Sequence, residues 1–193
     1  MANILVLGAG SMGTAFSFPC SDNGHLVSIV GTHLENDFID KINSTKKHPA
    51  LDCEVAKNVK FLKFEKLKEE LNKKIDLIVV AVVSKGIEWA SSEISKVLKS
   101  YIPILILTKG LAINNNNYEV LAHKMERLFK QNGVKETNIS AAGGPCLAKN
   151  LANKAHTAVV FANKDIKIAE KISKLVSTDY YHVSTSDDVV GVE

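Results

Sequence analysis

The sequence predicts an α/β fold in which helices cover both faces of a doubly wound, mostly parallel β-sheet. Short runs rich in β-branched apolar residues recur along the chain, and segments with helical spacing separate them. The expected strands are 4–7, 27–30, 59–62, 75–83, 102–107, 139–142 and 158–161. Runs 75–83 and 102–107 are apolar without alternation, as in strands covered on both faces, so we expect them at the middle of the sheet.

Helices are expected between these strands, where apolar residues repeat every three to four positions. The expected helices are 12–23, 35–42, 64–72, 85–98, 118–131, 146–152 and 165–176. The polar segment 43–57 is interpreted as a surface loop. After a strand-like run at 180–183, Asp187 and Asp188 are expected to be solvated or to cap a helix.

The composition is that of an ordinary globular domain, with 193 residues of which 46% are hydrophobic and 23% charged. Neither a linker nor a repeat divides the chain, so residues 1–193 are expected to form one domain. The formal net charge is +3 and the lysines are dispersed, so no nucleic-acid or membrane partner is expected. Three irregularly spaced cysteines, with no leader or membrane-length run, predict a reducing, cytoplasmic setting without disulfides or a metal site.

The strongest local signal is the segment GAGSMG at 8–13, which follows the first expected strand and opens a helix. In this pattern Gly8 permits a tight turn, Gly10 lets the backbone approach a diphosphate, and Gly13 allows close packing of helix against strand. Amide groups of the first helical turn then face the anion. The segment therefore predicts a dinucleotide site; the alternative is a glycine-rich turn without a ligand.

A carboxylate for the adenosine ribose is expected about 20 residues later. The sequence has Gly31, Thr32 and His33 there instead, so it does not decide between NAD and NADP as the cofactor. Thr32 and His33 are expected beside the ribose or a 2′-phosphate, unless His33 is a surface residue without a role. Glu35 is an alternative candidate for this carboxylate, but it lies inside an expected helix and is interpreted as solvated.

Further loops follow expected strands at 84–85, 108–110 and 143–145, and ligands bind outside the carboxyl ends of parallel strands. Lys109 ends a buried strand, where a cation can hold a phosphate or stabilise charge on a carbonyl oxygen; the alternative is a solvated lysine. Pro145 is interpreted as the first residue of a helix. There Cys146 would have a lowered pKa, or else pack inertly.

Six segments, taken in order, resemble the NAD(P)-dependent glycerol-3-phosphate dehydrogenases. They are GAGSMGTA at 8–15, NGH at 23–25, TKG at 108–110, GP-x-x-A at 144–148, TAVVF at 157–161 and D-x-x-G-x-E at 188–193. The resemblance implies a Rossmann-type fold and hydride transfer between NAD or NADP and a substrate. It also implies interconversion of dihydroxyacetone phosphate and sn-glycerol 3-phosphate, and a possible homodimer of the full-length enzyme.

The resemblance also implies roles for individual residues at the cofactor. Ser11 and Met12 would lie along the diphosphate, Thr32 and His33 near the adenosine ribose, and Ala148 against the cofactor.

At the substrate, the resemblance implies that Lys109 is catalytic and contacts both cofactor and substrate, and that Gly144 and Cys146 contact the substrate. Cys146 departs from the family, which usually has serine or a small polar residue there, and a thiol is a poorer donor than a hydroxyl. Val83 and Asn150 depart from a common proline and a common acidic residue.

Members of the family continue into a helical second domain that supplies another lysine, and these 193 residues do not contain that domain. We therefore expect this chain to bind a dinucleotide and to have little activity alone, because ketone reduction needs both charge stabilisation and a proton donor. Two alternatives remain at this stage: a related 3-hydroxy-acid or ketopantoate-type reductase, and a non-catalytic dinucleotide-binding module.

Overall fold

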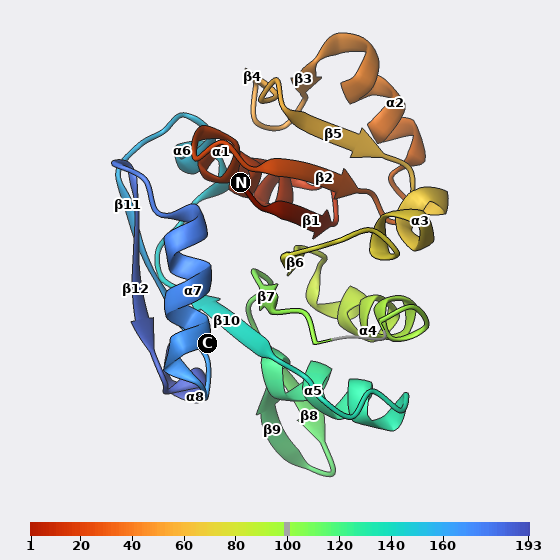
Figure 1. Ribbon diagram of the computed structural model, residues 1–193, viewed down its shortest axis with the longest axis vertical. Helices are drawn as coiled ribbons and strands as arrows, with labels where there is room; N and C mark the ends of the chain where they lie inside the picture. Colours follow the sequence, from red (N-terminus) through yellow and green to blue (C-terminus); the bar gives the residue numbers. More distant parts are fainter. Residues whose placement is uncertain (99–100) are drawn as a thin grey trace.

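The computed structural model describes residues 1–98 and 101–193 and contains an eight-stranded sheet (Figure 1). Its strands are β1 (Asn3–Leu7), β2 (Leu26–Val30), β5 (Val59–Leu62), β6 (Leu77–Val80), β7 (Ile104–Ile106), β10 (Ile139–Gly143), β11 (Thr157–Ala162) and β12 (Tyr181–Ser186). The order across the sheet is β12-β11-β10-β7-β6-β1-β2-β5. The six neighbouring strands β10, β7, β6, β1, β2 and β5 are parallel, β11 runs antiparallel to β10, and β12 is parallel to β11.

Helices cover both faces of this sheet, which confirms the doubly wound α/β fold. They are α1 (Ser11–Asp22), α2 (Asn36–Thr45), α3 (Leu67–Leu71), α4 (Ile87–Ser95), α5 (Leu121–Gln131), α6 (Ala148–Ala152), α7 (Ile166–Val176) and α8 (Val189–Val192). Two 3₁₀ turns, η1 (Phe64–Lys66) and η2 (Ser84–Gly86), open the expected helices at 64–72 and 85–98. One apolar cluster joins α1, α2, α6 and α7, and a second joins α3, α4, α5 and α8.

The strands alternate their side chains between these two clusters. In β1, Ile4 and Val6 belong to the first cluster, and Leu5 and Leu7 to the second. Strands β6 and β7 lie at the middle of the sheet with every residue buried, as their unbroken apolar runs predict.

The strand order reverses at β1. The chain adds β2 and β5 on one side of β1 and then crosses to β6 on the other side. The carboxyl ends of β1 and β6 therefore lie next to each other, and a Cβ built on Gly8 would be only 2.7 Å from the carbonyl oxygen of Ala81. In sheets of this kind, ligands bind at such a reversal.

Segment 43–57 is not simply a surface loop. Helix α2 continues to Thr45, and a small hairpin follows, formed by β3 (Lys47–His48) and β4 (Cys53–Glu54). His48 and Leu51 are buried, and the His48 ring meets the Phe38 ring edge-on at 5.0 Å. The burial of His48 and Leu51 could not be predicted, because the residues around them in the sequence are mostly polar.

The helix expected at 118–131 begins too early. Residues before it form a hairpin of β8 (Leu111–Asn114) and β9 (Asn117–Val120), which projects from one end of the molecule (Figure 1). Asn115 and Asn116 form its two-residue turn, both with positive φ, a conformation that asparagine tolerates well. Helix α5 starts at Leu121.

The last segment confirms the expected strand and cap. Residues 181–183 of the expected run belong to β12, and the Asp188 carboxylate accepts a hydrogen bond from the Gly191 amide at 2.8 Å. Asp188 is therefore the cap of α8.

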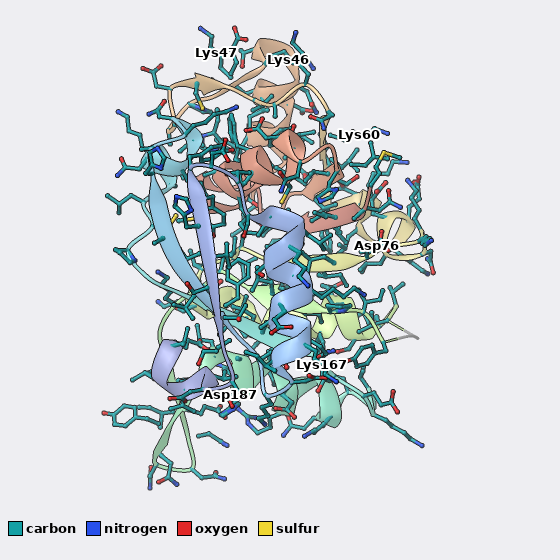
Figure 2. All side chains as sticks on the ribbon, turned by 60° about the vertical axis from the view of Figure 1, so that its left-hand side comes forward. Lys46, Lys47, Lys60, Asp76, Lys167 and Asp187 are labelled. Atoms are coloured by element: carbon teal, nitrogen blue, oxygen red, sulfur yellow. The ribbon has the colours of Figure 1, made fainter. Side chains whose placement is uncertain are left out.

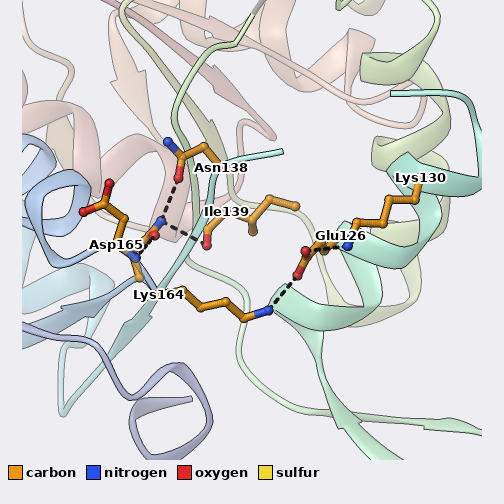
Figure 3. A network of polar contacts seen from close by, with 7 residues as sticks. Glu126, Lys130, Asn138, Ile139, Lys164 and Asp165 are labelled. Atoms are coloured by element: carbon orange, nitrogen blue, oxygen red, sulfur yellow. Dashed lines mark hydrogen bonds and ion pairs between the residues drawn. The ribbon is translucent and has the colours of Figure 1, made fainter. Parts of the chain in front are cut away.

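A polar network holds the amino end of β10, the edge opposite to Gly8 (Figure 3). The Asn163 side-chain amide donates to Asn138 Oδ1 (3.1 Å) and Ser140 Oγ (2.8 Å), and Asn163 Oδ1 accepts from the Asp165 amide (2.9 Å). Beside it, Lys164 pairs with Glu126 at 3.2 Å. These contacts join β10, β11, α5 and α7.

Figure 2 shows Lys46 and Lys47 at one end of the molecule and Lys167 at the other, so positive charge is spread over the surface. Within residues 1–98 and 101–193, no helix has both the length and the apolar character needed to cross a membrane.

Candidate functional site: the carboxyl edge of the sheet

The glycine-rich turn after β1 has the geometry that its sequence predicts. Gly8 has φ +109°, and a side chain there would also press against Ala81. A Cβ on Gly13 would overlap the carbonyl oxygen of Gly8, so this glycine lets α1 pack closely on the turn. Gly10 differs: its φ is −62°, and the only atom within 4 Å of an added Cβ is Glu35 Oε1, at 4.0 Å. Space beside Gly10 is therefore open.

Helix α1 begins at Ser11, and the residue before it, Gly10, has no side chain that could cap the first helical turn. Within the helix, the first amide with a backbone acceptor is that of Thr14, which donates to the Gly10 carbonyl at 3.0 Å. Among the described residues, the amides of Ser11, Met12 and Gly13 have no hydrogen-bond acceptor. Free amides at the positive end of a helix dipole form an anion site.

Glu35 corrects one expectation. It is half-buried and lies just before the helix, because α2 begins at Asn36 and the Glu35 carboxylate turns back toward the glycine-rich turn. Its Oε2 accepts hydrogen bonds from the amides of Thr32 (2.6 Å) and Ala9 (3.3 Å). The fold thus brings a carboxylate to the end of β2, although the sequence has none at 31–33.

His33 lies on the surface after β2, but it is not isolated. Its ring lies 5.3 Å from the ring of Trp89 and 6.3 Å from that of Phe64, and those two rings are 5.4 Å apart. The two partners come from α4 and η1, so sequence reasoning did not connect them. The one available signal is that Trp89 is the only tryptophan in the chain.

Lys109 and Gly144 meet at the far side of the same edge. Thr108 fixes the end of β7 because its hydroxyl donates to the Val82 carbonyl at 2.5 Å. Gly110 then turns the chain with φ +140°, and the exposed Lys109 ammonium donates to the Gly144 carbonyl. Lys109 is therefore more than a solvated lysine at a strand end, since its side chain bridges two loops.

Cys146 lies before the expected helix start, and its surroundings favour packing over a lowered pKa. Helix α6 begins at Ala148, so Pro145 and Cys146 belong to the turn before the helix and not to its first turn. Burial raises the pKa of the Cys146 thiol, and the nearby Lys109 charge lowers it by less. Cys146 and Ala148 are partly buried and pack on the same apolar cluster as Met12 of α1. Helix α6, which begins at Ala148, packs against α1.

Gly143 is a structural residue that sequence reasoning missed. A Cβ there would overlap the carbonyl oxygen of Val192, so α8 packs directly against the end of β10. The Glu193 carboxylate accepts from the amides of Leu121 (2.7 Å) and Ala122 (3.1 Å) at the start of α5. The C-terminal segment therefore supports the turn that carries Gly144.

The expected site residues form two groups on one edge of the sheet. Free amides at 11–13, Glu35, Thr32 and His33 surround the end of β1 and β2, and Lys109, Gly144 and Cys146 surround the ends of β7 and β10. The first group is suited to a diphosphate and a sugar. The second offers a cation beside a glycine turn. No group of three or more His, Cys, Asp or Glu side chains suited to a metal occurs in the described part of the chain.

Known proteins are similar to this chain in sequence. The chain is 29% identical over 190 residues to the NADP(+)-dependent glycerol-3-phosphate dehydrogenase of Archaeoglobus fulgidus, covering 98% of this chain and 55% of that protein. It is 30% identical over 197 residues to glycerol-3-phosphate dehydrogenase [NAD(P)+] of Exiguobacterium sp., covering 100% of this chain and 54% of that protein. The chain thus spans about half the length of these curated relatives.

Solved structures show the same fold. The crystal structure of glycerol-3-phosphate dehydrogenase from Coxiella burnetii superposes with a TM-score of 0.83 at 22% identity, over 100% of this chain and 56% of that one. A putative 2-dehydropantoate 2-reductase from Enterococcus faecalis gives 0.66 at 18% identity, over 97% and 57%. The family model described as "NAD-dependent glycerol-3-phosphate dehydrogenase N-terminus" matches residues 3–169, and the chain belongs to this family.

Proposed function

We propose that residues 1–193 form the dinucleotide-binding domain of an NAD(P)-dependent glycerol-3-phosphate dehydrogenase. One observation supports the proposal most directly. The space beside Gly10 is open, and the backbone amides at 11–13 next to it have no hydrogen-bond acceptor among the described residues. Gly8, Gly10 and Gly13, with Ser11 and Met12, would hold the diphosphate. Thr32 and His33 would lie beside the adenosine, and Ala148 beside the rest of the cofactor.

The residues present fit a dinucleotide, because a Cβ on Gly10 would fill the space that a diphosphate needs and nothing else occupies it. When bound, the nicotinamide supplies or accepts the hydride. Relatives carry names with NADP(+) and with NAD(P)+, so their names leave the preferred form open.

Lys109 is the proposed catalytic residue of this domain. Its ammonium is exposed and needs only to leave the Gly144 carbonyl to reach a ligand. There it would stabilise negative charge on a substrate oxygen, either of a phosphate or of a carbonyl being reduced. Gly144 and Cys146 would line the substrate. The proposed reaction interconverts dihydroxyacetone phosphate and sn-glycerol 3-phosphate: the carbonyl carbon gains a hydride and its oxygen a proton.

The proposal extends to the setting of the whole protein. The three cysteines are free, which fits a reducing compartment such as the cytoplasm. Exposed apolar side chains, including Leu147 (67% exposed) and Tyr118 (77%), fit association into a homodimer. The proposed partners are the small phosphorylated substrate and a second copy, with no part for nucleic acid or a membrane.

Replacement of Gly10 by serine tests the proposal, because serine is a good helix cap and the site has room for its side chain. The fold should therefore survive while the diphosphate space is filled. We expect NADH to quench the fluorescence of Trp89 in the wild type, and Gly10→Ser to weaken binding at least tenfold, about 1.4 kcal/mol. Unchanged affinity in a folded variant would overturn the proposed site.

Substrate class is tested on the full product of the gene. Dihydroxyacetone phosphate should be reduced with a far higher kcat/KM than 2-dehydropantoate. The reverse preference would identify a reductase of the ketopantoate type. Tight nucleotide binding with neither substrate reduced would identify a non-catalytic module.

A further inference from the structure

Glu35 is placed where it would meet the adenosine half of a bound dinucleotide. It precedes α2, and the hydrogen bonds of its Oε2 to the amides of Thr32 and Ala9 hold the carboxylate between β2 and the glycine-rich turn. Among the described residues, its other oxygen, Oε1, has no hydrogen-bond donor, and it faces the open space beside Gly10. One oxygen is thus anchored and one is available as an acceptor.

Gly31 makes this arrangement possible. A Cβ at Gly31 would lie 3.2 Å from Glu35 Cβ and 3.1 Å from Ile39 Cγ1, closer than side chains normally pack. The missing side chain lets the start of α2 press against the end of β2. A carboxylate four positions beyond that glycine can therefore reach the place where a strand-end carboxylate binds the ribose in other dinucleotide folds.

In the part of the chain that the structure describes, Glu35 forms no salt bridge. Arg127, the only arginine in the sequence, pairs with Glu119 on the β9–α5 segment, and Lys63 pairs with Asp40. His48 packs beneath the turn, where burial lowers its pKa and keeps it neutral near pH 7. Asp37, in the first turn of α2, adds further negative charge.

We propose that Glu35 makes this domain selective for NAD over NADP, by accepting a hydrogen bond from the ribose 2′-hydroxyl and repelling a 2′-phosphate. A free carboxylate oxygen satisfies the hydroxyl donor, whereas a phosphate carries like charge and finds no arginine in its place. The inference rests on the proposed function, since it presumes that the diphosphate binds at 8–13. It goes beyond it by naming the cofactor and the residue that selects it.

The experiment compares the dissociation constants of NADH and NADPH by Trp89 fluorescence. Trp89 is the only tryptophan, and its ring lies 5.3 Å from that of His33, so it reports on this end of the site. The wild type should bind NADH at least tenfold more tightly than NADPH. Glu35→Gln keeps a carbonyl acceptor for the Thr32 and Ala9 amides and should reduce that ratio at least fivefold, mainly by tightening NADPH. Added salt should also reduce the wild-type ratio.

Asp37→Asn is the matched control, because it removes the same charge two residues away and should leave the ratio unchanged. Leu34→Arg is a second variant, independent of the Glu35 hydrogen bonds, since Leu34 is 83% exposed. The added cation should tighten NADPH and leave NADH almost unaffected.

The possible results separate the two proposals. If both nucleotides bind with similar affinity, or NADPH binds more tightly, and Glu35→Gln changes nothing, the selectivity inference is wrong and the proposed function stands. An equal effect of Asp37→Asn would also overturn the inference, because general charge and not Glu35 would then set the preference. If the folded wild type binds neither nucleotide, the proposed function itself fails.

Discussion

Lys109 and Cys146 influence each other because both lie at the Gly144 turn. Burial of the thiol disfavours the thiolate, and the neighbouring ammonium offsets part of that effect. With the pKa raised, the thiolate fraction near neutral pH is below that of an ordinary cysteine. Cys146 is therefore a packing residue whose reactivity reports the position of Lys109.

We expect iodoacetamide to modify Cys146 more slowly near neutral pH than it modifies an unstructured cysteine peptide. Lys109→Gln should slow the reaction by roughly a further twofold or more, because the pKa rises again when the cation is lost. Peptide mass spectrometry resolves Cys146 from Cys20 and Cys53. Lys149→Gln, a nearby change of equal charge, should have little effect; equal slowing by both variants, or faster reaction after Lys109→Gln, would contradict this account.

At single positions, the roles that could be predicted from the sequence are those set by the backbone within a few residues. Gly8 and Gly13 have the roles that their spacing indicates, because close backbone contacts forbid a side chain at both. For Glu35 the sequence offered both a ribose carboxylate and a solvated side chain and favoured the second, because its orientation depends on Gly31 and on amides of Thr32 and Ala9. Its position in the sequence carries no trace of those contacts.

Helix α8 is short, and a single cap and two contacts hold it in place. The Asp188 carboxylate caps the helix, Val192 packs on Gly143, and Glu193 accepts from the first amides of α5. A Cβ on Gly191 would overlap Asp188 Oδ2. The spacing D-x-x-G therefore has a physical reason: the glycine leaves room for the capping carboxylate.

Gly191→Ala should lower the free energy of unfolding by about 1 kcal/mol, the usual effect of losing a helix cap. Urea denaturation measures the change. Val190→Ala is the control in the same helix, because this side chain is 59% exposed and should contribute much less. Equal destabilisation by the two variants would show that the cap has no special role.

Among the elements, buried strands and long amphipathic helices were predictable, and short hairpins were not. The unbroken apolar runs of β6 and β7 have one physical solution, burial in the middle of a parallel sheet. The β8–β9 hairpin depends on two asparagines with positive φ, which resemble a compositional bias in a lysine- and asparagine-rich sequence. The alternation of Leu111 and Ile113 before them was the available signal.

Across the whole molecule, the two edges of the sheet differ in how their polar groups are satisfied. The carboxyl edge leaves amides free at 11–13, whereas the amino edge is closed by side chains such as Asn163 and His25. His25 and Asn23 belong to the NGH segment and bond to the Leu175 carbonyl at the end of α7, each at 2.9 Å. We therefore expect side chains at the amino edge of the sheet to stabilise the fold, and groups at the carboxyl edge to bind the ligand.

His25 gives the test of that separation. It is 8% exposed, and its Nδ1 accepts from the Ala2 amide at 3.2 Å, so Nε2 carries the proton and donates to Leu175. His25→Ala leaves the Ala2 amide without this acceptor and should lower the free energy of unfolding by about 1–3 kcal/mol.

NADH affinity should stay unchanged in this variant, because the amino ends of β1 and β2 lie opposite to the Gly8 turn. Urea unfolding and Trp89 titration on the same samples measure both quantities. His182→Ala serves as the control, since this exposed histidine stacks on His156 at 5.8 Å and its replacement should cost little stability. Were NADH affinity to fall together with stability in His25→Ala, the two edges would be coupled through the sheet, and the assignment of binding to the carboxyl edge alone would be wrong.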